Sequence, residues 1–309
     1  MKLGTILRPA AAVVLGALVL TGCGDDKKDD KGNAAPAGSA APGGSSAPAA
    51  DAPKKIVSLT PSATEMLYAI GAGKQVVAVD DQSNFPAEAP KTELSGFKPN
   101  VEAIAKYTPD MVVISDDIDG VKAKLETLKI KVVEVPAAKN FTEMYAQFDK
   151  LGAATGHAGE AAAVTAKMKK DIEEIVAKAK KPAAPLNYFH ELDNSGYSVT
   201  SKTFIGEVYG LFGLKNIADA ADKSGSGYPQ VSTEHIVQAD PDLIFLADTK
   251  CCQQNLDTVS KRPGWDKIKA VQTGNVVALD DDIASRWGPR VVDLVKAVAQ
   301  AVDKAGAGA

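Results

Sequence analysis

Cysteine, histidine and tryptophan are scarce in this chain of 309 residues, which contains three, three and two of them. Cys251 and Cys252 are adjacent and Cys23 lies far from both, so the chain cannot form the disulfide framework that stabilises small secreted domains. The three histidines do not have the spacing of a zinc or manganese site. We therefore expect no metal site, and a fold that is stabilised by the packing of its core.

The motifs of common α/β enzymes are also missing. There is no Gly-x-Ser-x-Gly nucleophile elbow and no Gly-x4-Gly-Lys-Ser/Thr phosphate loop, and residues 71–73 (GAG) lack a third glycine in step. The net charge is −4, and no stripe of Lys and Arg alternates with aromatic residues, which argues against a nucleic-acid partner. We expect no catalytic residues, and the alternative of a secreted α/β hydrolase is disfavoured.

The longest apolar run lies at the start of the chain and has the pattern of an export signal. Lys2 and Arg8 lie before the apolar residues 10–20 and supply positive charge, and the apolar run is too short to span a bilayer. The run ends in residues 20–23 (LTGC), which resemble a bacterial lipobox. We expect residues 1–22 to be a lipoprotein signal peptide and Cys23 to carry the lipid, which would hold the chain outside the cytoplasm on a bacterial membrane, in the cell envelope or periplasm. An ordinary signal peptide is the alternative.

Residues 23–53 have the composition of a linker. Alternating Asp and Lys residues are followed by a stretch of Ala, Gly, Ser and Pro, and such a segment buries too little apolar surface to fold. We expect a disordered tether between the lipid anchor and a globular body.

From residue 54 onward, short apolar runs alternate with amphipathic stretches, which predicts parallel sheets covered by helices. The pattern occurs twice, so we expect an N-terminal α/β lobe over residues 54–152 and a C-terminal α/β lobe over residues 183–304, with a short tail at 305–309. The expected strands cover residues 56–59, 76–79, 111–114, 132–135, 186–189, 243–246 and 276–279.

The two lobes also repeat one another in sequence. Residues 100–114 match residues 232–246 at a constant offset, so that Glu234 corresponds to Glu102. Glu65 lies six residues before Gly71, as Glu207 does before Gly213. Between the lobes, residues 153–182 contain a proline-free stretch, 157–181, with apolar residues at helical spacing, and this predicts one long helix joining the lobes.

Three segments carry a resemblance to a known family: residues 56–65 (IVSLTPSATE), residues 228–232 (YPQVS), and Asp282 to Arg286 followed by Pro289-Arg290. From about Lys54 to Val302 the chain resembles the substrate-binding proteins of ABC importers for cobalamin, haem and iron-siderophores, and within them the cobalamin binders most. The resemblance implies the class III periplasmic binding protein fold. It further implies a monomer without an intrinsic cofactor that holds a cobalamin or another corrinoid between its lobes and passes it to a permease dimer with ATPase subunits.

Glu102 and Glu234 each follow a helix-capping residue, Asn100 or Ser232, by two positions. Taken alone, each carboxylate is explained by its favourable interaction with a helix dipole. The resemblance implies a further role, because the matching glutamates of the family project from the lobe tips and pair with arginines of the permease.

The resemblance also implies a ligand site in loops that follow the strands. Aromatic side chains would form apolar walls, Arg286 would donate hydrogen bonds to the rim of the corrin, and Asp282 would accept them. The expected ligand-binding residues are Asp81, Gln82, Phe97, Tyr197, Tyr228, Asp282, Arg286 and Trp287. The alternatives are partial core packing for the aromatic residues and a surface ion pair for Asp282 and Arg286.

The chain departs from the cobalamin binders in its first lobe, where Gln82 and Gly96 replace an aromatic pair. A haem ligand therefore stays open, with Tyr197, Tyr228 and His190 as candidate iron ligands, although His190 lies in an apolar run typical of a structural histidine. Cys251 and Cys252 could remain thiols or close as a vicinal disulfide, which we favour in an oxidising compartment.

Overall fold

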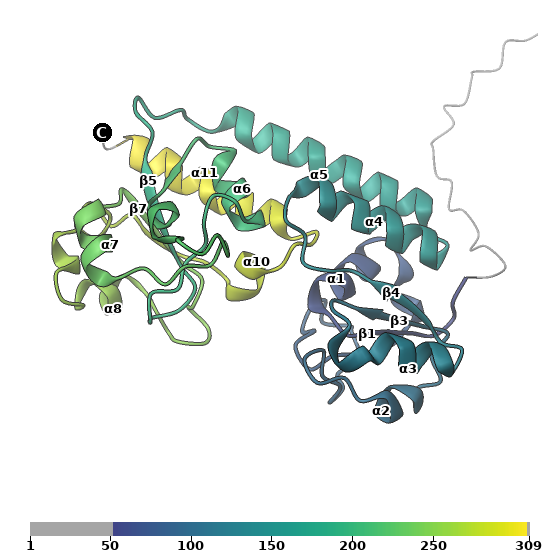
Figure 1. Ribbon diagram of the computed structural model, residues 1–309. Coiled ribbons are helices and arrows are strands. Elements are labelled where there is room, and N and C mark those ends of the chain that lie inside the picture. Colours follow the sequence, from purple (N-terminus) through teal and green to yellow (C-terminus); the bar gives the residue numbers. More distant parts are fainter. Residues whose placement is uncertain (1–51, 308–309) are drawn as a thin grey trace, which may run out of the picture. The chain divides into compact units, whose positions relative to one another are not determined.

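The computed structural model describes residues 52–307 (Figure 1). The expected signal peptide, the lipidation site Cys23, nearly all of the expected linker and residues 308–309 lie outside this range. No helix among the described residues has both the length and the apolar character needed to cross a membrane.

The N-terminal lobe is built on a four-stranded parallel sheet in the order β2-β1-β3-β4. Successive residues of the central strand β3 (Met111–Ile114) pack on opposite faces, Met111 and Val113 on one and Val112 and Ile114 on the other. This is why the strand reads as an unbroken apolar run. Its elements are β1 (Ile56–Ser58), α1 (Pro61–Ala69), β2 (Val76–Val79), α2 (Val101–Ala105), β3, α3 (Val121–Thr127), β4 (Lys131–Glu134) and α4 (Phe141–Thr155).

The C-terminal lobe repeats this topology with the strand order β6-β5-β7-β8, also parallel throughout. The prediction of two parallel α/β lobes is therefore confirmed. One strand was not predicted, because β6 has only two residues, Lys215 and Asn216, and neither is apolar. The elements are β5 (Asn187–Glu191), α6 (Phe204–Gly210), β6 (Lys215–Asn216), α7 (Thr233–Ala239), β7 (Leu243–Leu246), α8 (Leu256–Ser260), α9 (Lys269–Gln272), β8 (Val276–Ala278), α10 (Asp281–Ser285) and α11 (Val291–Ala307).

A long helix, α5 (Ala158–Lys178), connects the lobes and packs against α4 and α11 (Figure 1). Its buried residues Ala161, Thr165, Met168 and Ile172 recur every three or four positions, which gives one apolar face. The helix ends earlier than the expected 181, because Ala179 is extended ahead of Pro182. The expected lobe boundary at 152 also falls inside α4.

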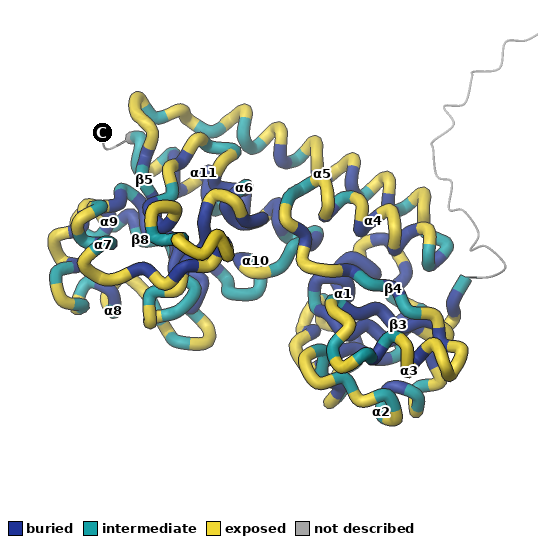
Figure 2. The backbone as a smooth tube through the Cα atoms, in the orientation of Figure 1, coloured by how far each residue is buried: buried dark blue, intermediate teal, exposed yellow. Residues whose placement is uncertain are grey.

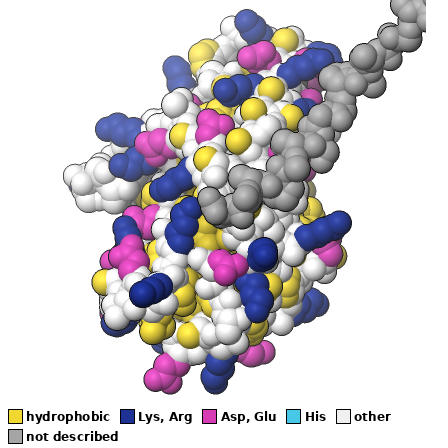
Figure 3. All heavy atoms as spheres, turned by 90° about the vertical axis from the view of Figure 1, so that its right-hand side faces the viewer, with side chains coloured by type: hydrophobic (Ala, Val, Ile, Leu, Met, Phe, Trp, Pro, Cys, Tyr) yellow, Lys and Arg dark blue, Asp and Glu magenta, His cyan; other side chains and the backbone are white. Residues whose placement is uncertain are grey.

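One hydrophobic core extends through both lobes. It contains Ile56 and Met111 from the first sheet, Met168 from α5, and Phe245 and Leu294 from the second lobe. One smaller cluster lies on the other face of each sheet. Figure 2 shows buried positions along the strands and on the inner sides of the helices, and Figure 3 shows acidic and basic side chains interspersed over one face.

Candidate functional site

A cavity of about 400 Å³ lies at the carboxyl ends of the first-lobe strands and is lined by residues of both lobes. Residues from the loops after β1, β2 and β3 form one wall, including Thr60, Asp80 and Ser115. Asp282, Arg286 and other residues of the second lobe form the opposite wall. The carboxyl edge of a parallel sheet is where α/β proteins usually bind ligands, so this cavity is the candidate functional site.

Five of the eight residues expected to bind ligand line this one cavity: Gln82, Phe97, Asp282, Arg286 and Trp287. Phe97 is 75% exposed, which is unusual for so large an apolar side chain and typical of a binding surface.

The other three expected residues are not among those lining the cavity. Asp81 is exposed and lies in the sequence between two residues that do line the cavity, Asp80 and Gln82. Tyr197 and Tyr228 lie on the second lobe and are 44% and 50% exposed, so neither is a core residue. Tyr197 forms a β-bridge with Gln230, which fixes it to the segment that carries Tyr228.

A buried ion-pair cluster joins the lobes beside the cavity. The side chain of Glu65, in α1, has no exposed surface and accepts hydrogen bonds from two arginines of the second lobe. Nη1 of Arg286 lies 3.0 Å from Oε1 of Glu65, while Nη2 and Nε of Arg290 lie 2.6 and 2.8 Å from Oε1 and Oε2. Phe85 of the first lobe covers Arg290, with the guanidinium carbon 4.4 Å from the ring centroid. Both arginines are thereby held across the interface.

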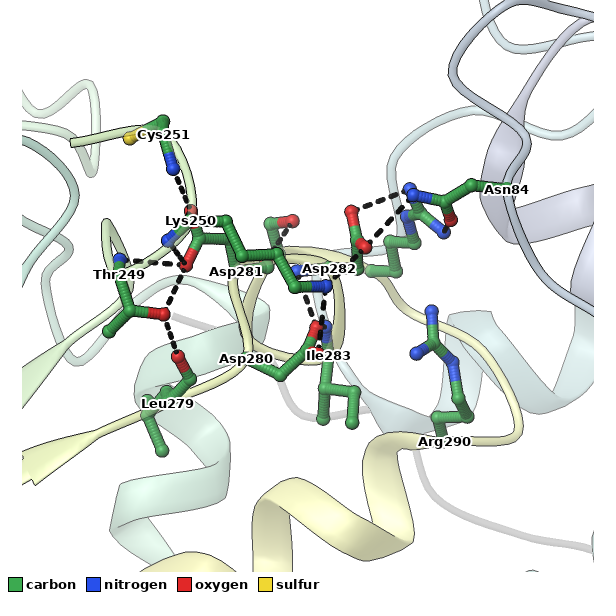
Figure 4. A network of polar contacts seen from close by, with 12 residues as sticks. Asn84, Thr249, Lys250, Cys251, Leu279, Asp280, Asp281, Asp282, Ile283 and Arg290 are labelled. Carbon is green, nitrogen blue, oxygen red and sulfur yellow. Dashed lines mark hydrogen bonds and ion pairs between the residues drawn. The ribbon is translucent and has the colours of Figure 1, made fainter. Parts of the chain in front are cut away.

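Arg286 and Asp282 form the expected i,i+4 ion pair, 2.7 Å between Nη2 and Oδ1. The pair is not a surface feature, because Arg286 is 9% exposed and also donates to Oδ1 of Asn84 and to the carbonyl oxygen of Gln82. Oδ2 of Asp282 accepts from Nδ2 of Asn84 at 3.0 Å (Figure 4). Both residues therefore contact the opposite lobe.

A polar network fixes the position of Asp282 on the second lobe (Figure 4). Asp280 caps α10 by accepting from the backbone N–H groups of Asp282 and Ile283. Nζ of Lys250 lies 2.8 Å from both Asp280 and Asp282. Burial alone would raise the pKa of Asp282, but hydrogen bonds from Lys250 and Asn84 and the charge of Arg286 together lower it. Asp282 is thus an ionised acceptor at neutral pH.

The neighbouring loop is attached to the same network. The carboxylate of Asp281 accepts from the backbone N–H groups of Thr249, Lys250 and Cys251, at 2.8 to 3.0 Å. In this loop Cys251 and Cys252 form a disulfide. The contacts to Asp281 hold the loop beside α10.

Glu102 and Glu234 occupy equivalent positions in the two lobes. The side chain of Asn100 caps α2 by accepting from the N–H of Ala103, and Ser232 caps α7 in the same way from His235. Each glutamate is the second residue of its helix and is exposed to solvent. Neither lines the cavity, so their carboxylates are free for a role elsewhere on the surface.

The three histidines have no common site, and no cluster of potential metal ligands occurs within residues 52–307. His190 is fully buried, and its Nδ1 lies 2.7 Å from the hydroxyl of Tyr209. Burial lowers the pKa of His190 to about 3, so the ring is neutral at physiological pH. These features are those of a core histidine, and His190 is not among the residues that line the cavity.

A family model described as periplasmic binding protein matches residues 56–283. The chain belongs to the periplasmic binding protein family. Members of this family are solute-binding proteins, and the relatives below place the chain among those that serve ABC transporters.

Three similar proteins agree with this assignment. An ABC transporter substrate-binding lipoprotein of Bacillus subtilis is 33% identical, over 94% of this chain and 95% of its own. A cobalamin-binding protein of Halobacterium salinarum is 31% identical, over 81% and 69% of the two chains. The crystal structure of a possible iron-binding, periplasmic solute-binding protein of Staphylococcus epidermidis has a TM-score of 0.69 at 27% identity, over 81% and 98%.

Sequence reasoning missed the partners that hold this binding protein's lobes together: Glu65, Asn84, Phe85 and the role of Arg290. One signal was present, because Glu65 is an acidic residue within the mostly buried helix α1. A buried acid requires a cationic or hydrogen-bonding partner. The partner could not be identified from the sequence, since Arg286 lies 221 residues away.

A buried pair of acidic residues in the second lobe, Glu191 and Asp248, was also missed. Glu191, at the end of β5, forms two hydrogen bonds of 2.6 Å with Arg262, which in turn donates to Gln254. Asp248, after β7, is fully buried near Glu191. Burial and the neighbouring Glu191 raise the pKa of Asp248 to about 7, although Arg262 opposes the shift. The group therefore keeps its proton well above the usual pH range of an aspartate.

Proposed function

We propose that this solute-binding protein captures a corrinoid between its two lobes and delivers it to the permease of an ABC importer. The observation that carries the proposal is that the cavity combines Phe97 and Trp287 with the charged pair Asp282 and Arg286. A corrin is a broad macrocycle with amide groups on its rim, and it requires apolar contact surface together with both a donor and an acceptor. The similarity to a cobalamin-binding protein supports the same ligand.

The corrinoid is larger than the cavity, so part of it would lie outside. Tyr197 and Tyr228 are exposed on the second lobe and would contact that part of the macrocycle. Asp81 would lie at the edge of the same surface. Gln82 is the residue where the chain lacks an aromatic wall, and its side-chain amide would instead contact a polar rim group.

A haem or an iron-siderophore is the alternative ligand, favoured by the similarity to a possible iron-binding protein. Haem iron would need a protein ligand, and the exposed hydroxyls of Tyr197 and Tyr228 are the candidates. His190 is not, because it is fully buried within β5 and its Nδ1 bonds to the hydroxyl of Tyr209.

Titration calorimetry with cyanocobalamin, haemin and a ferric siderophore, each in separate runs, tests the proposal. We expect a dissociation constant for cyanocobalamin in the micromolar to nanomolar range, about −8 to −12 kcal/mol. Absence of corrinoid binding, together with a haem absorption band that disappears in Tyr197→Phe or Tyr228→Phe, would replace the corrinoid by haem.

The delivery step is proposed to involve both lobe tips and the start of the chain. Glu102 and Glu234 would pair with arginines of the two permease halves, since such pairs fix the orientation of a complex. A lipid on Cys23 would hold the protein at a bacterial membrane surface outside the cytoplasm. The permease would then separate the lobes slightly and release the ligand.

A further inference from the structure

Glu65 is the only acidic residue of α1, and it is fully buried where the two lobes meet. It accepts three hydrogen bonds, one from Arg286 and two from Arg290. A charge that is removed from water in this way is costly unless it is fully paired. The three bonds satisfy this requirement only while the second-lobe arginines stay in place against the first lobe.

The partners of Arg286 show which lobe determines its orientation. Its two terminal nitrogens donate four hydrogen bonds, and three of the acceptors belong to the first lobe: Glu65, the side chain of Asn84 and the carbonyl oxygen of Gln82. Only Asp282 comes from its own lobe. A second-lobe side chain that lines the cavity is therefore held in place mainly by the first lobe.

Among the three first-lobe acceptors, Glu65 is the one that also binds a second cation. Arg290 directly precedes α11 and donates to both carboxylate oxygens of Glu65. Glu65 therefore connects α1 to both ends of the turn between α10 and α11. This turn includes Trp287, which also lines the cavity.

We infer that Glu65 is a positioning residue of the ligand site, which holds Arg286 and the turn before α11 at the separation of the lobes where the cavity can bind its solute. The inference rests on the proposed use of this cavity for solute binding, but not on which solute is bound. Buried ion pairs of this kind specify geometry more than they add stability.

The repeat within the chain supplies a matched control. Glu207 in α6 corresponds to Glu65 in α1 in the sequence repeat, and it accepts a hydrogen bond from the backbone N–H of Phe141, the first residue of α4, at 2.7 Å. Glu207 contacts neither Arg286 nor Arg290, and it does not line the cavity. Loss of its charge should leave the ligand site unchanged.

The test compares Glu65→Gln and Glu207→Gln in the full-length protein. Lys124 in the first lobe and Lys261 in the second are exposed. Each is replaced by an azide-bearing amino acid, a spin label is attached to each azide, and the distance between the two labels reports the separation of the lobes. We expect a broader distance distribution in Glu65→Gln only. Stopped-flow dissociation of cyanocobalamin, or of whichever tested solute binds, should be at least 10-fold faster in Glu65→Gln and within twofold of the parent in Glu207→Gln.

Two further variants separate positioning from a general loss of stability. Arg286→Ala and the double variant Glu65→Gln/Arg286→Ala should differ in affinity by less than Glu65→Gln differs from the parent, because Glu65 acts partly through Arg286 and partly through Arg290. Glu65→Asp keeps the charge and should fold even where the amide does not, and it should restore part of the slow dissociation. An unchanged distance distribution with unchanged dissociation in both Glu65 variants would overturn the inference. If no tested solute binds the parent, the corrinoid proposal fails, and the distance measurement still decides the role of Glu65.

Discussion

Asp248 is a buried acid whose protonation should be visible in the stability of the whole protein. Its pKa is raised in the folded state, so the folded chain binds a proton that the unfolded chain has lost between about pH 4 and pH 7. Folding is therefore penalised progressively as the pH rises through this range, and the full penalty remains above pH 7. Asp248 is thus a residue that lowers stability at neutral pH.

Asp248→Asn removes this titration while keeping the shape of the side chain. The variant should match the parent near pH 4 and be more stable by about 1 to 3 kcal/mol at pH 8. Urea unfolding at a series of pH values measures the difference, and the titration of His190 cancels because both proteins contain it. Asp149→Asn, at an exposed position of α4, is the control and should show no such trend.

The hydrogen bonds of Arg286 lead to a specific prediction about ligand affinity. Arg286→Lys keeps the charge, but an ammonium group cannot serve four acceptors arranged around a planar guanidinium. We expect this variant to weaken cyanocobalamin binding by about 1.5 to 3 kcal/mol, close to the loss expected for Arg286→Ala. Calorimetry should show normal binding in Arg262→Lys, since Arg262 pairs with Glu191 away from the cavity. If Arg286→Lys bound cyanocobalamin with full affinity, the guanidinium group of Arg286 would have no specific role in ligand binding.

At the scale of single helices, variants of Glu102 in α2 and Glu234 in α7 can distinguish ligand binding from delivery to the permease. The double variant Glu102→Ala/Glu234→Ala should abolish importer-dependent uptake and leave the affinity for ligand unchanged, because both side chains are exposed and outside the cavity. Loss of the favourable interaction with the helix dipoles should cost less than about 2 kcal/mol in total.

Uptake in cells and calorimetry on the purified protein measure the two effects of this double variant in parallel. Glu126→Ala, an exposed glutamate of α3, is the control and should retain uptake. If the double variant lost ligand affinity but still associated with the permease, the docking role of the two glutamates would be wrong.

The helices and strands were largely predictable because the buried strands are continuous apolar runs and the long helix has one apolar face. The elements that escaped were short or polar, such as β6. In the candidate site, the Asp282–Arg286 pair was predictable because the two residues are close in sequence, whereas Gln82, Phe97 and Trp287 were expected there only through the family resemblance. The contacts of Glu65, Asn84 and Phe85 with the second lobe depend on how distant segments fold together, which local patterns do not encode.

For the molecule as a whole, attachment to a membrane should be separable from folding. Cys23→Ser should move the protein from the membrane fraction to the soluble extracytoplasmic fraction, because it removes the proposed lipid site. The melting temperature of a purified fragment of residues 52–309 should equal that of the purified Cys23→Ser protein, since the linker composition predicts no contribution to either core. Retention of Cys23→Ser on the membrane would count against the lipobox.

The core that runs through both lobes has a consequence for how the protein unfolds. Because residues of both sheets pack into one cluster with α5, neither lobe can lose its structure without exposing apolar surface of the other. Unfolding should then be a single cooperative transition in calorimetry, and amide hydrogens of β1 and β7 should exchange with deuterium with the same free energy of opening. An isolated half of the chain should behave as a fragment, dependent on its complement to acquire protection.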